Sequence, residues 1–162
     1  MIAQVLASMR PDIIAKLVLC DTGFKIGSKD IWDQRIDLVK EKGLYDVSKS
    51  IVERWFSRQY IANNFDEIGL FRRMLQNTST SGYIECCKAI SKADLTSFTS
   101  NLKQPTLVIG GSDDISTPPK LVAETAKMIN MSELKIIEHS GHLPCVDSPE
   151  FFVSLLNDFC EK

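Results

Sequence analysis

Three short apolar runs, far apart in the sequence, have the pattern of buried parallel strands. LVLC gives a strand at about residues 16–20, TLVIGG lies within residues 105–111, and LKII occupies residues 134–137. Unbroken apolar runs of this length are typical of strands that are covered on both faces. Each run is followed by small and polar residues (Asp-Thr-Gly, Ser-Asp-Asp and Glu-His-Ser-Gly), which predict loops at the carboxyl ends of the strands.

Apolar residues at helical spacing fill most of the remaining chain. Residues 1–10 predict a short helix that stops at Pro11. Between residues 28 and 100, four amphipathic segments follow one another without a strand signal, which indicates a helical insertion, or cap. Residues 119–130 predict a helix with proline at its start, and Ser148 is the expected N-cap of a last helix.

These elements predict an α/β fold with about three parallel strands, flanking helices and a four-helix cap. The cap helices are expected over SKDIWDQRIDLVKEKG, which stops at Gly43, and over DVSKSIVERWFSRQYIA, FDEIGLFRRMLQN and YIECCKAISKA. The chain accordingly divides into a first helix and strand of the α/β core (1–27), the helical cap (28–100), and a last part of the core (101–162).

Composition narrows the class of protein. The 162 residues are 44% hydrophobic and 25% charged, as in ordinary globular domains, and the net charge of −2 gives no reason to expect nucleic acid or an anionic membrane as a partner. No apolar run approaches the ~20 residues that a membrane span needs, and the first residues do not resemble a signal peptide. Five irregularly spaced cysteines without a CxxC pair predict reduced thiols, a cytoplasmic location and no metal site.

Two of the predicted strand ends carry side chains that can take part in acid–base chemistry. Asp113 and Asp114 follow the second strand, and His142 follows the third. Carboxyl ends of neighbouring parallel strands meet at one edge of the sheet, where a carboxylate can accept the Nδ1–H of a histidine and orient it as a general base. Asp21, after the first strand, is a third carboxylate at this edge, for which a turn or N-cap role is expected.

The motifs at these strand ends resemble the C-terminal half of the α/β-hydrolase fold. They are Gly-Gly-Ser-Asp-Asp-Ile-Ser-Thr-Pro-Pro at residues 110–119 and Ser-Gly-His-Leu-Pro at residues 140–144. More finely, MIAQVLASMRPDIIAKLVLCDTGFKIG, ERWF, GYIECCKAISKADL and GHLPCVDSPEFF are similar to 3-oxoadipate enol-lactonases. The resemblance implies that Asp114 is the acid and His142 the base of a catalytic triad, because the D-x-x-T-P-P spacing fits Asp114 and not its neighbour Asp113. It also implies an enzyme that needs no cofactor.

The sequence departs from the family pattern in one respect. It contains no G-x-S-x-G, the motif that carries the nucleophilic serine, and the resemblance implies that this motif would lie just before residue 1. The expected function is therefore hydrolysis of a carboxylic ester or lactone of the enol-lactonase type, by a truncated chain that is inactive or weakly active alone. The alternative is an inactive fragment that serves as an oligomerising or small-molecule-binding module. A third hypothesis, residual hydrolysis by a different nucleophile or an activated water, ranks last.

The cap offers candidate substrate-binding residues, namely Trp32, Arg35, Arg54 and Trp55. An arginine suits a lactone that carries a carboxylate, because guanidinium binds carboxylate through two hydrogen bonds. For each of these residues, packing within the cap is the alternative interpretation. The resemblance also implies that LVLC pairs with the strand that carries the nucleophile. Because this chain lacks that strand, we expect either a homodimer or association with a separate N-terminal half through the exposed edge.

Overall fold

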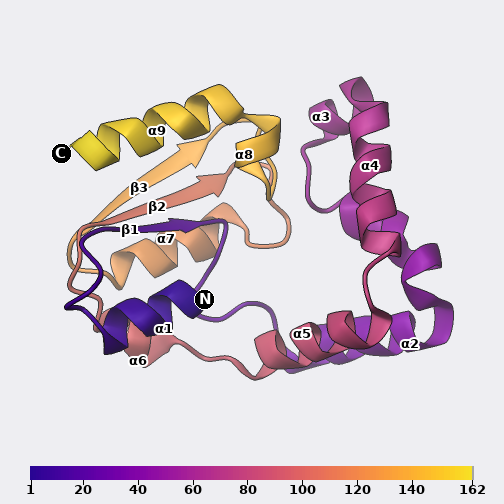
Figure 1. Cartoon of the computed structure of the whole chain (residues 1–162), viewed down its shortest axis with the longest axis horizontal. Coiled ribbons are helices and arrows are strands. Elements are labelled where there is room, and N and C mark those ends of the chain that lie inside the picture. The colour runs from indigo at the N-terminus through magenta and orange to yellow at the C-terminus, as the bar shows by residue number, and fades with distance from the viewer. Residues whose placement is uncertain (162) are drawn as a thin grey trace.

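A three-stranded parallel sheet lies at the centre of the fold in the computed structural model, which describes residues 1–161 (Figure 1). Strands β1 (Leu17–Cys20), β2 (Thr106–Gly111) and β3 (Ser132–Ile137) lie side by side in chain order. The middle strand β2 is buried along its whole length, which explains its run of apolar and small residues. The three predicted strands are confirmed, each to within two residues at either end.

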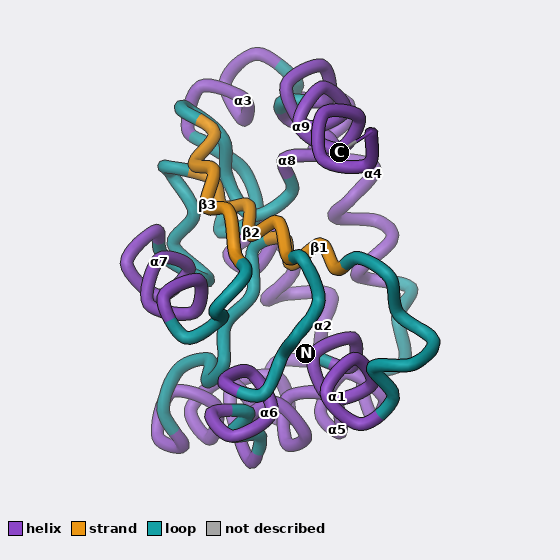
Figure 2. Tube along the Cα trace, turned by 90° about the vertical axis from the view of Figure 1, so that its left-hand side faces the viewer, coloured by secondary structure: helices purple, strands orange, loops and turns teal. Residues whose placement is uncertain are grey.

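One face of the sheet is covered by helices that precede and follow the cap in the sequence (Figure 2). These are α1 (Ile2–Met9), α6 (Thr96–Ser100) and α7 (Pro119–Lys127). Ala7 of α1 and Val122 of α7 pack with Leu19 and Val108 of the strands in one buried cluster. Because β1 and β2 are separated by the whole cap in sequence, this cluster joins the two parts of the chain that form the sheet.

The opposite face of the sheet is covered by the last helix, α9 (Pro149–Glu161) (Figure 2). Phe159 of α9 packs on Leu107 and Ile109 of β2 and on Ile137 of β3. The side chain of Lys16 donates hydrogen bonds to the carbonyl oxygens of Phe159 and Cys160, at 2.9 and 2.8 Å. A cation at a helix C-terminus satisfies carbonyl groups that have no partner within the helix, so this contact holds the end of α9 against the sheet.

Four helices form a separate group beyond the carboxyl ends of the strands (Figure 1). They are α2 (Lys29–Val52), α3 (Arg58–Asn63), α4 (Phe65–Gln76) and α5 (Thr80–Lys92), and together they are called the helical cap below. Its core contains Val39, Val52, Phe56 and Leu75. At Gly43 the backbone of α2 leaves the helical conformation, with a positive φ of 75° that favours glycine, at the predicted stop.

The predicted second cap helix is wrong over part of its length. DVSKSIVERWFSRQYIA is not one continuous helix, because α2 ends at Val52 and α3 starts only at Arg58. Residues 53–57 form a tight connection instead, and the Ser57 side chain caps α3 by accepting a hydrogen bond from the Tyr60 N–H at 3.2 Å. The apolar spacing of this stretch therefore reflects burial in the cap core more than continuous helix.

The outer edges of β1 and β3 have no partner strand within residues 1–161. At β1, the N–H groups of Leu17 and Asp21 donate to the carbonyl oxygens of Pro105 and Ile109, so the alternation of a parallel ladder turns the backbone groups of Val18 and Cys20 towards the open edge. Ile2, Leu6 and Met9 of α1 are exposed. No helix among the described residues is long and apolar enough to cross a membrane.

The strand directions determine where functional residues can gather. All three strands point their carboxyl ends towards the short helix α8 (Pro144–Asp147) and the helical cap (Figure 1). Loops that leave these ends meet in the space between sheet and cap, as in other open α/β sheets. The division of the chain at residues 27 and 100 stays a prediction.

Candidate active site

Asp114 lies in the loop after β2 and is held by donors from its own turn. Its Oδ1 accepts hydrogen bonds from the backbone N–H groups of Ser116 and Thr117, at 2.7 and 3.1 Å, and its Oδ2 accepts the Thr117 hydroxyl at 2.6 Å. The side chain is fully buried. The Asp-x-x-Thr spacing makes this turn possible, because an aspartate can accept from the backbone two and three residues ahead.

His142 meets Asp114 across the ends of β2 and β3. The Nδ1 of His142 lies 2.8 Å from Oδ2 of Asp114, which orients the ring and leaves Nε2 for a reacting group. Burial favours the neutral form of both groups. The hydrogen bond and the opposite charges outweigh burial, so they lower the pKa of Asp114 and raise the pKa of His142. Asp113 is exposed and hydrogen-bonds to Ser112 instead.

A network beneath the ring positions the loop that carries His142. Asp147 of α8 accepts hydrogen bonds from the hydroxyl of the buried Ser140 and from the N–H of Gly141. Gly111 touches the same loop so closely that a Cβ there would lie 2.2 Å from the carbonyl oxygen of Gly141. Sequence reasoning missed Asp147, although its place in the first turn of a proline-started segment was a usable signal.

Asp21 lies in the bend after β1, as expected, and its side chain also reaches this site. Its backbone has a positive φ of 43°, and its Oδ1 accepts the Gly111 N–H at 2.9 Å. Ligand atoms of Asp21, Asp114 and His142 all lie within 4.8 Å of one another. Burial raises the pKa of Asp21 to about 7, against the opposite effect of hydrogen bonds from Cys20 and Gly111.

These three residues are the group best placed to hold a metal ion among the described residues, but their oxygens and nitrogens already have other partners. Both oxygens of Asp114 accept hydrogen bonds from its own loop, and its Oδ2 also meets Nδ1 of His142. Asp21 accepts from Gly111 and from the Cys20 thiol. The arrangement therefore suits proton transfer by an oriented imidazole better than ligation.

A cavity of about 440 Å³ opens in front of His142, between the strand ends and the helical cap. All four cap residues singled out from the sequence line it, together with Asp21, Thr117 and Tyr83: they are Trp32, Arg35, Arg54 and Trp55. The guanidinium of Arg35 lies 5.4 Å from the ring centroid of Trp32. Burial, and then the like charge of Arg35, lower the pKa of Arg54. The structure thus brings two cations and two indoles to the same cavity as the histidine.

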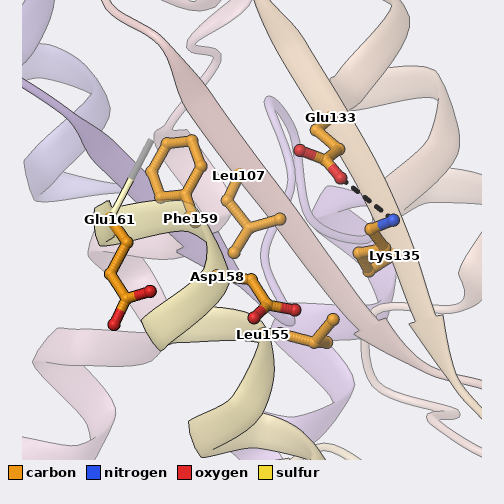
Figure 3. A pocket seen from close by; sticks show the side chains of 7 residues that line it. All are labelled: Leu107, Glu133, Lys135, Leu155, Asp158, Phe159 and Glu161. Carbon is orange, nitrogen blue, oxygen red and sulfur yellow. Dashed lines mark ion pairs between the residues drawn. The ribbon is translucent and has the colours of Figure 1, made fainter.

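A second cavity, of about 420 Å³, lies between α9 and the amino-terminal halves of β2 and β3 (Figure 3). Leu107 and Phe159 form its apolar wall, and Glu133 and Lys135 pair at 2.9 Å along its rim. It is on the side of the sheet that is remote from the strand ends carrying Asp114 and His142. His142 lines the first cavity and not this one.

Comparison with known proteins identifies a family and several relatives. Residues 1–149 match the family described as the alpha/beta hydrolase fold. The 3-oxoadipate enol-lactonase 2 of Acinetobacter baylyi is 30% identical over 152 residues, which are 92% of this chain and 55% of that protein. The 3-oxoadipate enol-lactonase 1 of the same organism is 29% identical over 146 residues, or 90% of this chain and 54% of that protein.

Solved structures agree with these relatives. The enol-lactonase from Burkholderia xenovorans has a TM-score of 0.94 to this chain at 26% identity, covering 99% of this chain and 61% of that one. The chain spans a little over half the length of the curated relatives it matches first. It belongs to the α/β-hydrolase fold family, and its strands and helices match the C-terminal part of that fold.

Proposed function

We propose that this chain supplies the acid, the base and the substrate cavity of a hydrolase that acts on a carboxylic ester or lactone, of the 3-oxoadipate enol-lactonase type. One observation carries the proposal: the buried Asp114 holds Nδ1 of His142 at 2.8 Å, with the ring at the wall of a cavity. A base held in this way can take a proton through Nε2 and return it to a leaving group.

The proposed reaction follows the usual two stages of a serine hydrolase. Nε2 of His142 takes the proton of a serine hydroxyl while the serine oxygen bonds to the substrate carbonyl carbon. The C–O bond to the leaving oxygen then breaks, and that oxygen receives the proton. Water hydrolyses the acyl-serine by the same steps, and Asp114 stabilises the imidazolium that forms in each stage.

The substrate is proposed to carry a carboxylate beside the reacting carbonyl. Arg35 and Arg54 line the cavity, and their proximity is energetically unfavourable unless an anion lies between them. Trp32 and Trp55 provide flat apolar walls for the body of a small lactone. The names of two relatives, both 3-oxoadipate enol-lactonases, support this substrate class.

The nucleophile is proposed to come from a segment that docks at the open edge of β1. The 162 residues contain no G-x-S-x-G, and the relatives are nearly twice as long as the matched region. The backbone groups of Val18 and Cys20 face the open edge, where a further parallel strand can pair, and the exposed apolar residues of α1 lie nearby.

The five cysteines are all unbridged, which supports a reducing, cytoplasmic setting.

A chimaera tests this function. The part of the Acinetobacter baylyi 3-oxoadipate enol-lactonase 2 that precedes the matched region is joined to Met1, and hydrolysis of an anionic enol-lactone is measured. We expect turnover that His142→Ala lowers by about 10²-fold or more. A folded chimaera without turnover, or one whose rate does not change with His142→Ala, would contradict the proposal.

A further inference from the structure

Residues 54–56, in the connection between α2 and α3, make contacts with the site that substrate binding does not explain. The backbone N–H of His142 donates to the carbonyl oxygen of Trp55 at 2.8 Å. Gly141 lies against the same segment, and a Cβ at Gly141 would stand 2.7 Å from both the Trp55 oxygen and the Phe56 Cα. The loop that carries the base therefore rests directly on the backbone of the cap.

The same segment also holds the loop that carries the acid. Nη2 of Arg54 donates to the carbonyl oxygen of Ile115 at 3.1 Å, and the Ser116 hydroxyl donates to the Arg54 carbonyl oxygen at 3.4 Å. Ile115 and Ser116 directly follow Asp114, and the Ser116 N–H donates to Asp114 at 2.7 Å. Two adjacent cap residues thus contact both partners of the acid–base pair through their loops.

The segment is rigid enough to act as a fixed support. The N–H groups of Arg54 and Trp55 donate to the last turn of α2, at 3.1 and 2.9 Å. Phe56 is buried and packs against the rings of Tyr60 and Phe71, with centroid distances of 5.2 and 5.0 Å. Phe56 therefore anchors the segment in the cap core.

We infer that residues 54–56 are a positioning element, through which the helical cap sets the geometry of the His142–Asp114 pair. The inference rests on the proposed role of His142 as a base. The other groups that face His142 are Asp21 from the end of β1, Thr117 from the acid loop and the guanidinium of Arg54. A displacement of the segment moves both loops at once, so the ring loses its alignment with Asp114.

Histidine titration by NMR tests this in the full chain, which contains only two histidines. Gly141→Ala places a methyl group between the base loop and the cap, and Phe56→Leu loosens the anchor of the segment. In both variants the pKa of His142 is expected to fall towards its ordinary value by about 0.5 unit or more, because the bond to Asp114 weakens. His139, exposed at the surface, is the internal reference.

Two matched controls separate positioning from general destabilisation. Gly82→Ala adds a methyl group on α5, where the nearest atom to the new Cβ lies 3.5 Å away, and Ile129→Val opens a small space in the buried cluster beneath the sheet, which contains no residue of the segment. Neither control is expected to shift the pKa of His142. If Gly141→Ala does not fold, Phe56→Leu decides the question.

An unchanged His142 titration in folded Phe56→Leu, or an equal shift in Ile129→Val, would overturn the inference. The readout needs no nucleophile. Failure of the proposed function would instead appear as an inactive chimaera whose histidine still responds to the cap variants.

Discussion

Oδ2 of Asp114 accepts two hydrogen-bonding partners at once, the Thr117 hydroxyl at 2.6 Å and Nδ1 of His142 at 2.8 Å. The first bond fixes the carboxylate within its own loop, and the second extends that order to the loop after β3. Two residues 28 positions apart in the sequence are thereby held at hydrogen-bonding distance.

Asp114→Asn is expected to destabilise the chain most at low pH. The folded-state pKa of His142 is raised by Asp114, so the stability that protonated His142 contributes is complete below its unfolded pKa near 6.5 and is lost as pH rises through the folded pKa. Asn removes that contribution. Urea unfolding should show a larger loss at pH 5.5 than at pH 9, by about 1 kcal/mol.

Asp113→Ala is the matched control for this change, because Asp113 is exposed and does not contact His142. Its unfolding free energy should differ from wild type by less than about 0.5 kcal/mol at either pH. A loss in Asp114→Asn that stays the same from pH 5.5 to 9 would show that the pair does not titrate as proposed.

The free energy of unfolding of the Asp21→Asn variant should rise relative to that of wild type as pH rises. The folded pKa of Asp21 is about 7, above the value in an unfolded chain, so the folded state holds a proton that the unfolded state releases between about pH 4 and 7. Wild-type stability therefore declines across this window, by at most about 1.4 kcal/mol per pH unit, whereas the Asn variant lacks this decline. Denaturant melts at pH 5 and 8 measure it, and parallel pH profiles would refute the raised pKa.

Gly111→Ala is expected to disrupt the site by sterics alone. The added Cβ would lie 2.2 Å from the backbone oxygen of Gly141 and 2.3 Å from that of Ser140, and backbone atoms cannot rotate away as a side chain can. Thermal and urea unfolding should report a loss of about 3 kcal/mol or more. Gly69→Ala, where the only close atom is the flexible end of Arg73 at 3.6 Å, should show no such loss.

Asp147→Ala removes the acceptor for the buried Ser140 hydroxyl and for the Gly141 N–H. Leaving buried donors without a partner costs about 1–3 kcal/mol each, so the loop that carries His142 should lose order. The variant is expected to lower the chimaera's kcat more than it raises KM. A change confined to KM would assign Asp147 to substrate binding instead of to the base.

Arg35→Met is expected to change specificity while preserving much of the contact with Trp32, because methionine keeps a long apolar stem. The chimaera should lose roughly 10-fold or more in kcat/KM on a carboxylate-bearing lactone, since a hydrogen bond to a charged group contributes about 1.5–3 kcal/mol. Its rate on a neutral ester of similar size serves as the control. Equal losses on the two substrates would show that Arg35 does not bind the carboxylate.

The sequence was informative where function depends on local motifs. Apolar runs locate the strands, and the resemblance of D-x-x-T-P-P to the family motif selects Asp114, the carboxylate that lies 2.8 Å from His142, over Asp113. Such motifs encode their own turns, as the hydrogen bonds from Ser116 and Thr117 to Asp114 show. The hydrogen bonds that stabilise such a motif join residues within a few positions of one another.

Contacts between residues far apart in the sequence could not be predicted from such motifs. The backbone carbonyl of Trp55, which holds His142, has no side-chain signature in the sequence. The helix break before Ser57 was missed because Trp55 and Phe56 keep an apolar spacing, although Ser57 itself was a readable N-cap. The part of Asp21 in the site depends on the register of β1 beside β2, which tertiary packing decides.

Labelling with a fluorophosphonate, followed by intact mass, tests most directly whether His142 activates a serine from outside these 162 residues. We expect no adduct on the chain alone and one adduct on the chimaera, at its elbow serine. His142→Ala should slow labelling of the chimaera by about 10²-fold or more. A stoichiometric adduct on the chain alone would show that one of its own serines is the nucleophile. Unchanged labelling of the His142→Ala chimaera would show that His142 is not the base.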